Sequence, residues 1–160
     1  MNKKIYSPDA IIAVLQQYRS KLIGFTNGCF DIIHVGHVRI LAKIKEHCDI
    51  LVVALNSDSS IKRIKGANRP IIPLIERTEV IAAFESVDFV TYFDEDTPNN
   101  LIEKIQPQVL AKGGDWTIEH IVGRDIILKS GGKVLSMDYI KNASTTNIIE
   151  KIIQLHCNDK

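Results

Sequence analysis

Five short apolar runs most constrain the fold of this chain. They are Leu22 to Thr26, Ile50 to Leu55, Phe89 to Phe93, Val109 to Ala111 and Val134 to Met137. Each run has the length of a strand, and most are apolar throughout instead of alternating with polar residues. This pattern is typical of strands that are covered on both faces.

Segments with helical spacing lie between these runs. One apolar stripe falls within residues 38–44 and a second within residues 148–153. The start signal Ser7-Pro8-Asp9 predicts an N-terminal helix over about residues 7–19. Strands that alternate with helices predict an α/β fold, namely a Rossmann-like, doubly wound, mainly parallel five-stranded sheet with helices on both faces.

The chain is expected to form one domain. Its 160 residues are a usual domain length, and we find no repeat, low-complexity tract or composition shift. We therefore expect a single domain over residues 1–160 with its core over about 20–155. The longest irregular stretch runs from Asn56 to Pro73, because Pro70 and Pro73 limit its helix content, and a loop of this length is more often functional than idle.

Charge, hydropathy and cysteine content exclude several classes of protein. The 20 Lys and Arg nearly balance the 19 Asp and Glu, which argues against a nucleic-acid partner. No apolar run approaches the roughly 20 residues of a membrane span, and no signal peptide begins the chain. The three cysteines, Cys29, Cys48 and Cys157, have no paired spacing, which indicates a reducing compartment. We expect a cytoplasmic protein without a membrane partner.

Polar residues and glycines follow every predicted strand. The five strand exits are Asn27 to His37, Asn56 to Asp58, Asp94 to Asp96, Lys112 to Trp116, and Lys141 to Thr146. In an open parallel sheet the ligand binds outside the carboxyl ends of the strands. One edge of the sheet is therefore predicted to bind a polar ligand.

Phosphate suits the first and last of these exits. Gly28 and Gly36 let the backbone approach a ligand closely, and Gly36 opens a helix whose free N–H groups favour an anion. His34 and His37 are three residues apart, so both side chains can reach one phosphate. The last exit supplies hydroxyl groups at a second helix start, in residues 144–146.

A polyphosphate also fits the basic residues of the long loop. Lys62, Arg63, Lys65 and Arg69 place four cations within eight residues of a chain whose net charge is +1. Neither G-x-G-x-x-G nor G-x-x-x-x-G-K-[ST] occurs, which argues against a dinucleotide oxidoreductase and a P-loop ATPase.

Two consecutive motifs carry a family resemblance. Residues 27–31 (NGCFD) and 34–37 (HVGH) resemble the phosphate-binding signature of the cytidylyltransferase-like nucleotidyltransferases. Further matching segments follow in order: NSD at 56–58, KRIKG at 62–66, NRP at 68–70, KGGD at 112–115 and STTNII at 144–149. Over about residues 20–153 the set resembles the adenylyltransferase domains of ADP-heptose synthases.

The resemblance implies an activity. Such domains transfer AMP from ATP to D-glycero-β-D-manno-heptose 1-phosphate and release pyrophosphate, which yields ADP-heptose for the lipopolysaccharide inner core. It implies ATP as a substrate, Mg²⁺ bridging the phosphates with few protein ligands, small-molecule substrates as the partners, and a homodimer. Because no kinase accompanies these residues, we expect the stand-alone form.

The resemblance also implies the roles of individual residues. The residues expected to stabilise charge on the triphosphate are His34, His37, Lys62, Arg63 and Lys65. The residues expected to bind the nucleotide are Asn27, Gly28, Cys29, Phe30, Gly36, Asn56, Asp58, Arg69, Lys112, Gly113, Asp115, Ser144, Thr145 and Thr146. The residues expected to bind the acceptor are Asp31, Lys112 and Asp115, although Asp31 could instead orient His34. No protein-held metal is expected.

Several alternatives stay open. The same chemistry could use CTP with glycerol 3-phosphate or GTP with a heptose 1-phosphate, although residues 141–143 lack the Arg common in the CTP-using relatives. A non-catalytic nucleotide-binding module is the rival from another class. Asp31, His34 and His37 could bind zinc. Trp116 could stack on a base or be structural, and Arg77 could face the site or pair with a neighbouring Glu.

Overall fold

The predicted apolar runs form one parallel sheet in the computed structural model, which describes residues 3–114, 116–138 and 144–156. The strands are β1 (Ile23–Gly28), β2 (Ile50–Asn56), β3 (Phe89–Phe93), β4 (Val109–Gly113) and β5 (Lys133–Met137). They lie in the order β3-β2-β1-β4-β5, and each neighbouring pair is parallel. The order reverses between β1 and β4, which confirms the predicted doubly wound fold.

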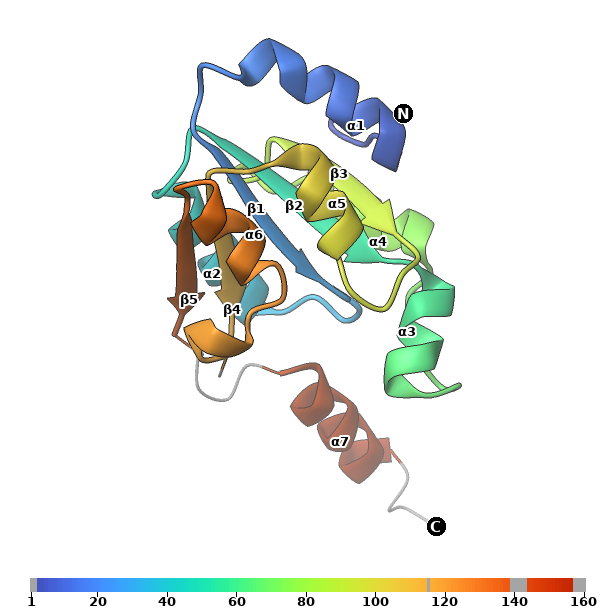
Figure 1. Ribbon diagram of the computed structural model, residues 1–160. Helices are drawn as coiled ribbons and strands as arrows, with labels where there is room; N and C mark the ends of the chain where they lie inside the picture. Colours follow the sequence, from blue (N-terminus) through green and yellow to red (C-terminus); the bar gives the residue numbers. More distant parts are fainter. Residues whose placement is uncertain (1–2, 115, 139–143, 157–160) are drawn as a thin grey trace.

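Helices cover both faces of the sheet (Figure 1). One face carries α1 (Pro8–Leu15), α5 (Asn99–Ile105) and α6 (Arg124–Lys129), and the other carries α2 (Val35–Lys45) and α4 (Leu74–Ala82). Two short 3₁₀ helices, η1 (Gln16–Tyr18) and η2 (Ile118–His120), complete these layers. No helix among the described residues is long and apolar enough to cross a membrane.

The interior strand β2 shows why its sequence is apolar without alternation. Val52 and Ala54 pack into the core under α1 and α5, whereas Leu51, Val53 and Leu55 pack into the core under α2 and α4. All five side chains are fully buried. A strand with helices on both faces therefore needs apolar residues at every position.

The N-terminal helix begins where its sequence predicts. The Ser7 hydroxyl accepts a hydrogen bond from the Ala10 amide at 3.3 Å, and Pro8 occupies the first turn, where its missing N–H costs no hydrogen bond. The helix continues as η1, so the helical segment ends at Tyr18. Ile11 and Leu15 are fully buried, so the helix belongs to the core and fixes one face of the sheet.

The prediction of an irregular segment from Asn56 to Pro73 is wrong for its first half. Residues Asp58–Lys65 form α3 at the carboxyl edge of the sheet (Figure 1). The Ser57 hydroxyl caps this helix by accepting from the Ser60 amide at 3.0 Å. Both prolines lie beyond the end of the helix, so they restrict the backbone only in the second half of the segment.

The side chain of Arg77 connects several chain segments at the carboxyl edge of the sheet. Arg77 lies in α4 and is completely buried. Its hydrogen bonds end on Ile72 O (2.9 Å), Cys29 O (2.6 Å), Asn56 O (3.0 Å) and Asp58 Oδ1 (2.6 Å). One guanidinium therefore fixes the exits of β1 and β2 and the chain segment that precedes α4.

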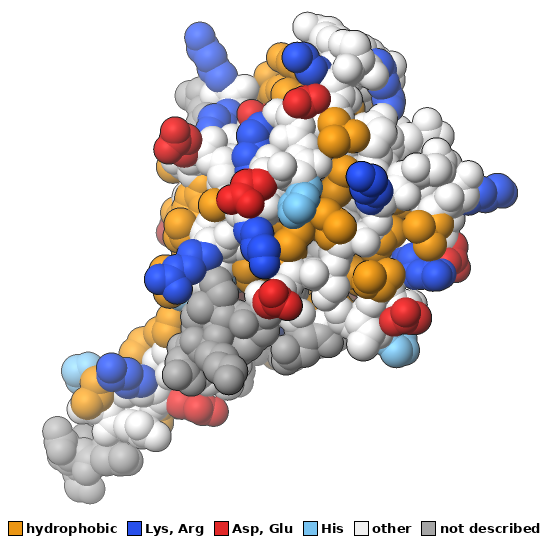
Figure 2. Space-filling model, turned by 90° about the vertical axis from the view of Figure 1, so that its left-hand side faces the viewer, with side chains coloured by type: hydrophobic (Ala, Val, Ile, Leu, Met, Phe, Trp, Pro, Cys, Tyr) orange, Lys and Arg blue, Asp and Glu red, His pale blue; other side chains and the backbone are white. Residues whose placement is uncertain are grey.

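The last helix, α7 (Thr145–His156), lies beyond the carboxyl edge and away from the packed layers (Figure 1). The sequence correctly predicts its apolar stripe, but no residue of the helix is buried. Ile152, Ile153 and Leu155 are each at least half exposed. In Figure 2 apolar side chains lie open on this projecting helix, whereas acidic and basic side chains are interspersed on the visible face of the domain.

We expect Arg77→Met to lower the free energy of unfolding by about 3 kcal/mol. Methionine keeps the length of the side chain but removes the donor of the buried carbonyl groups and one of the hydrogen bonds to the Asp58 carboxylate. Urea unfolding measures the change. The matched control is Arg39→Met on the exposed side of α2, for which a change within about 0.5 kcal/mol is expected. Equal effects of the two substitutions would show that the buried guanidinium is not structurally important.

Candidate active site

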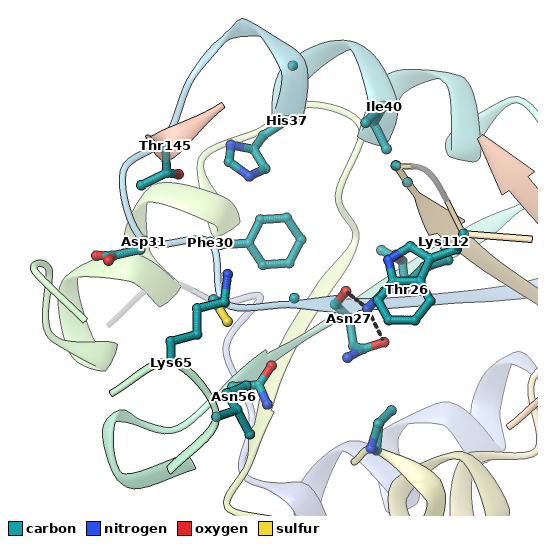
Figure 3. Close-up of a pocket in the computed structure, with 18 of the residues that line it drawn as sticks. Thr26, Asn27, Phe30, Asp31, His37, Ile40, Asn56, Lys65, Lys112 and Thr145 are labelled. Carbon is teal, nitrogen blue, oxygen red and sulfur yellow. Dashed lines mark hydrogen bonds between the residues drawn. The ribbon is translucent and has the colours of Figure 1, made fainter. Parts of the chain in front are cut away.

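A pocket of about 530 Å³ opens at the carboxyl edge of the sheet (Figure 3). It lies where the strand order reverses, as predicted for a ligand site in this kind of fold. The predicted site residues that line it are Asn27, Gly28, Cys29, Phe30, Asp31, His34, Gly36, His37, Asn56, Lys65, Arg69, Lys112, Gly113, Ser144, Thr145 and Thr146. The structure thus brings together residues that follow three strands, β1, β2 and β4, and residues at the start of α7. Asp58, Lys62 and Arg63 lie outside this lining, and Asp115 is outside the described residues.

His34 and His37 form a reciprocal cap at the start of α2. The Nδ1 atom of His34 accepts a hydrogen bond from the Gly36 amide at 3.1 Å. The Nδ1 atom of His37 accepts one from the His34 amide at 3.3 Å. The two ring centroids are only 3.9 Å apart. The HVGH motif therefore builds the helix start itself and holds two imidazoles side by side in the pocket.

This cap determines which nitrogen of each imidazole carries the proton. A nitrogen that accepts a hydrogen bond from an amide is unprotonated, so the proton of the neutral ring is on Nε2. Burial, together with the nearby His34 and Lys65 charges, lowers the pKa of His37 from 6.5 to about 4, and burial also lowers the pKa of His34. Both rings are neutral donors at neutral pH, which suits hydrogen bonds to phosphate oxygens.

Phe30 lies in the loop between β1 and α2, and its ring lines the pocket. Its φ of 47° is unusual for a residue with a side chain. The conformation places the phenyl ring 5.3 Å from the His37 ring, centroid to centroid. A Cβ atom at Gly28 would lie 3.1 Å from the Phe30 ring, so glycine lets the loop fold back this tightly. The NGCF segment thus supports the imidazoles.

The Asp31 carboxylate is bound by other residues of the protein and does not orient His34. Its carboxylate is 2.6 Å from Arg69 Nε and accepts hydrogen bonds from the amides of Ile71 and Ile72. Burial raises the pKa of Asp31, but the two amides and the Arg69 guanidinium outweigh it and lower the pKa below its ordinary value. The proposed contact with His34 is therefore wrong, because all these partners lie in the segment before α4.

The basic residues of α3 point in different directions. They occupy the last turn of a helix and not the long irregular loop that the sequence suggested. Lys65 lines the pocket, whereas Arg63 binds Asp96 at 2.8 Å and pairs with Asp94. Residues two apart in a helix are separated by about 200° around its axis, so Arg63 and Lys65 cannot face the same side.

Lys112 extends into the pocket from the end of β4. Its ammonium group donates to the backbone oxygen of Asn27 at 2.9 Å and to the side-chain oxygen of Asn27 at 3.1 Å (Figure 3). Burial lowers the pKa of Lys112 to about 8. The ammonium is also 5.9 Å from the centroid of the Trp116 ring. Trp116, His120, Ile121 and Val122 make this end of the pocket broad and more apolar.

The start of α7 lies beside the loop that joins β1 to α2. The Ser144 hydroxyl caps the helix by accepting from the Asn147 amide at 3.0 Å. The Thr145 hydroxyl donates to the backbone oxygen of Ile32 at 3.2 Å. Thr146 also lines the pocket. The second predicted helix start therefore faces the same space as the capping imidazoles.

Comparison with known proteins identifies the family. Residues 25–151 match the family model described as "Cytidylyltransferase-like". The chain belongs to the cytidylyltransferase-like family. The fold, the motifs and the relatives confirm the predicted nucleotidyltransferase.

Relatives of this nucleotidyltransferase match most of the chain but are longer. The protein named "Bifunctional protein HldE" of Geotalea uraniireducens is 52% identical over 151 residues, which are 93% of this chain and 31% of that protein. The HldE protein of Nitrobacter hamburgensis is 53% identical over 129 residues, which are 81% of this chain and 26% of that protein. The chain thus spans about a third or less of these curated relatives.

A solved structure has the same fold. It is the crystal structure of the lipopolysaccharide core biosynthesis protein from Thermoplasma volcanium, which matches with a TM-score of 0.61 and 25% identity. The match covers 77% of this chain and 99% of that one.

The zinc interpretation of the nucleotidyltransferase site has no support from the described side chains. Within residues 3–114, 116–138 and 144–156, no group of three or more His, Cys, Asp or Glu is placed to hold a metal ion. The Nδ1 atoms of both histidines are engaged with backbone amides.

Sequence analysis left two roles open for Arg77, which could face the site or pair on its helix with a neighbouring Glu such as Glu76 or Glu79. The guanidinium instead binds carbonyl groups of Cys29 and Asn56, which are distant in sequence. No local pattern could reveal these acceptors.

We expect His37 of the folded protein to remain neutral, with its proton on Nε2, from pH 8 down to about pH 5. Long-range ¹H–¹⁵N NMR spectra would report the tautomer and the titration. Because the unfolded chain takes up a proton near pH 6.5 and folded His37 only near pH 4, stability is expected to fall as the pH decreases through this window. A His37 titration near pH 6.5, or a proton on Nδ1, would contradict the capping geometry.

Proposed function

We propose that the protein transfers AMP from ATP to D-glycero-β-D-manno-heptose 1-phosphate. The products are ADP-heptose and pyrophosphate. The observation that carries this proposal is the single pocket in which two neutral imidazole donors, Lys65, Lys112 and the start of α7 meet. These groups suit two phosphate-bearing substrates better than any apolar ligand.

The reaction needs alignment and charge stabilisation more than a covalent intermediate. An oxygen of the sugar phosphate would bond to the α-phosphorus of ATP, while the bond from that phosphorus to the oxygen bridging to the β-phosphate breaks. The Nε2–H groups of His34 and His37 would donate to phosphate oxygens whose charge increases in the transition state. Lys65 would bind the departing pyrophosphate. No proton transfer to the protein is required.

Mg²⁺ fits this site as an ion carried by the nucleotide. Among the described residues of the lining there are two carboxylates, and Asp31 is bound by Arg69 and Asp96 by Arg63, so these two acidic groups are already engaged. The ion would therefore take most of its ligands from the triphosphate and water, and would neutralise phosphate charge when bound. The imidazole and Lys65 donors would still orient the phosphates directly.

The choice of acceptor is supported by the motifs and by the names of relatives. The ordered segments resemble adenylyltransferase domains of ADP-heptose synthases, and the similar proteins are named HldE or a lipopolysaccharide core biosynthesis protein. We also propose a cytoplasmic homodimer. The exposed apolar stripe of α7 supports association, because burying an apolar surface in an interface between subunits is energetically favourable.

A matrix of nucleotides and acceptors tests the proposed reaction. We expect pyrophosphate release with ATP and heptose 1-phosphate to exceed that with CTP, GTP or UTP by at least about tenfold in kcat/KM, and glycerol 3-phosphate to be a poor acceptor. Preference for CTP with glycerol 3-phosphate, or for GTP with the heptose, would establish one of the rival reactions. ATP binding without pyrophosphate release for any acceptor would indicate a non-catalytic module.

We expect His37→Ala to lower kcat by about a hundredfold or more, as for the loss of a transition-state donor. The measurement is steady-state pyrophosphate release at saturating ATP. A thermal unfolding curve of the variant separates this effect from unfolding, since the substitution also removes one half of the cap. His37→Gln, which keeps a donor, should retain more activity than the alanine variant. Wild-type turnover in His37→Ala would disprove the catalytic role.

A further inference from the structure

Lys112 is a cation in the pocket whose charge is not balanced by the described residues. Both of its hydrogen bonds go to neutral oxygen atoms of Asn27. No ion pair joins it to a carboxylate within the part of the chain that the structure describes. An ammonium group that is partly buried against neutral acceptors is destabilised unless an anion approaches. A bound anion would therefore gain more here than at an exposed lysine.

The position of Lys112 separates it from the imidazole side of the pocket. In Figure 3 His37 and Thr145 lie on one side of the Phe30 ring, and Lys112 and Asn27 lie on the other. Lys65 lies close enough to both sides to lower the pKa of His37 and of Lys112. The two sides are therefore distinct but adjacent, as two reacting phosphates must be.

The two sides differ in the kind of phosphate that they suit. The imidazole side has two ring N–H donors, the start of α2 and the hydroxyl groups of α7, which can follow a chain of phosphates. The Lys112 side offers one ammonium group, whose position is fixed by Asn27, next to the broad surface of Trp116. One fixed charge suits a single phosphate group attached to a bulky, uncharged body.

We propose that Lys112 binds the phosphate group of the acceptor and places its oxygen next to the α-phosphate of the nucleotide. This inference rests on the proposed function, since it takes the second substrate to be a sugar 1-phosphate. Asn27 holds the lysine in position, so it is a positioning residue. The triphosphate then occupies the imidazole side of the pocket.

The test measures the two substrates separately with Lys112→Met, a substitution that keeps an unbranched side chain but removes the charge. Calorimetry with heptose 1-phosphate should show at least a tenfold increase in Kd, whereas the Kd of ATP should change less than threefold. Lys112→Arg should restore part of the sugar phosphate affinity. Lys133→Met, at the opposite end of neighbouring strand β5 and exposed, is the control for loss of a lysine and should leave both Kd values unchanged.

Each outcome separates this inference from the proposed function. Equal binding of heptose 1-phosphate by wild type and Lys112→Met, with transfer intact in the wild type, would overturn the inference alone. A selective loss of ATP binding in the variant would also overturn it, because Lys112 would then serve the nucleotide. Failure of the wild type to bind heptose 1-phosphate would refute both. Should Lys112→Met fail to fold, Lys112→Gln is measured in its place, with the same expected and contrary results.

Discussion

The buried guanidinium of Arg77 is the interaction on which the carboxyl edge depends. A parallel sheet brings the ends of its strands to one side, but it does not by itself set the distance between the loops that follow. Arg77 sets that distance because its planar donors reach Cys29 and Asn56, at the exits of β1 and β2, from one rigid group. The segment before α4 is fixed by the same side chain and by the carboxylate of Asp31.

The fold could be predicted from the sequence because it depends on periodicity. Burial on both faces requires continuous apolar strands, and runs of this kind mark most of the strands, whereas the edge strand β5 is only partly apolar. The location of the pocket follows in the same way, since polar residues after parallel strands must gather at one edge. These features follow from the type and local spacing of the residues, so no knowledge of contacts between distant parts of the chain is needed.

The features that escaped prediction depend on partners far along the chain. The sequence suggested that Arg63 binds phosphate, but in the structure its guanidinium pairs with Asp94 and Asp96. Lys65, only two residues later, reaches the pocket because α3 turns the two side chains apart. The prolines of the following segment led to the prediction of an irregular loop in place of this helix, although they lie after its end. Spacing thus identified the cluster of cations but not which member faces the ligand.

The reciprocal cap of α2 explains why two imidazoles stand at this helix start. The ring of histidine carries an acceptor and a donor on opposite sides, so one edge can complete the backbone of the helix while the other is free to donate a hydrogen bond into the pocket. A carboxylate could complete the cap by accepting from the same amide, but it carries no donor for a phosphate oxygen. Histidine is thus selected here for the span of its ring and not for its ability to change charge.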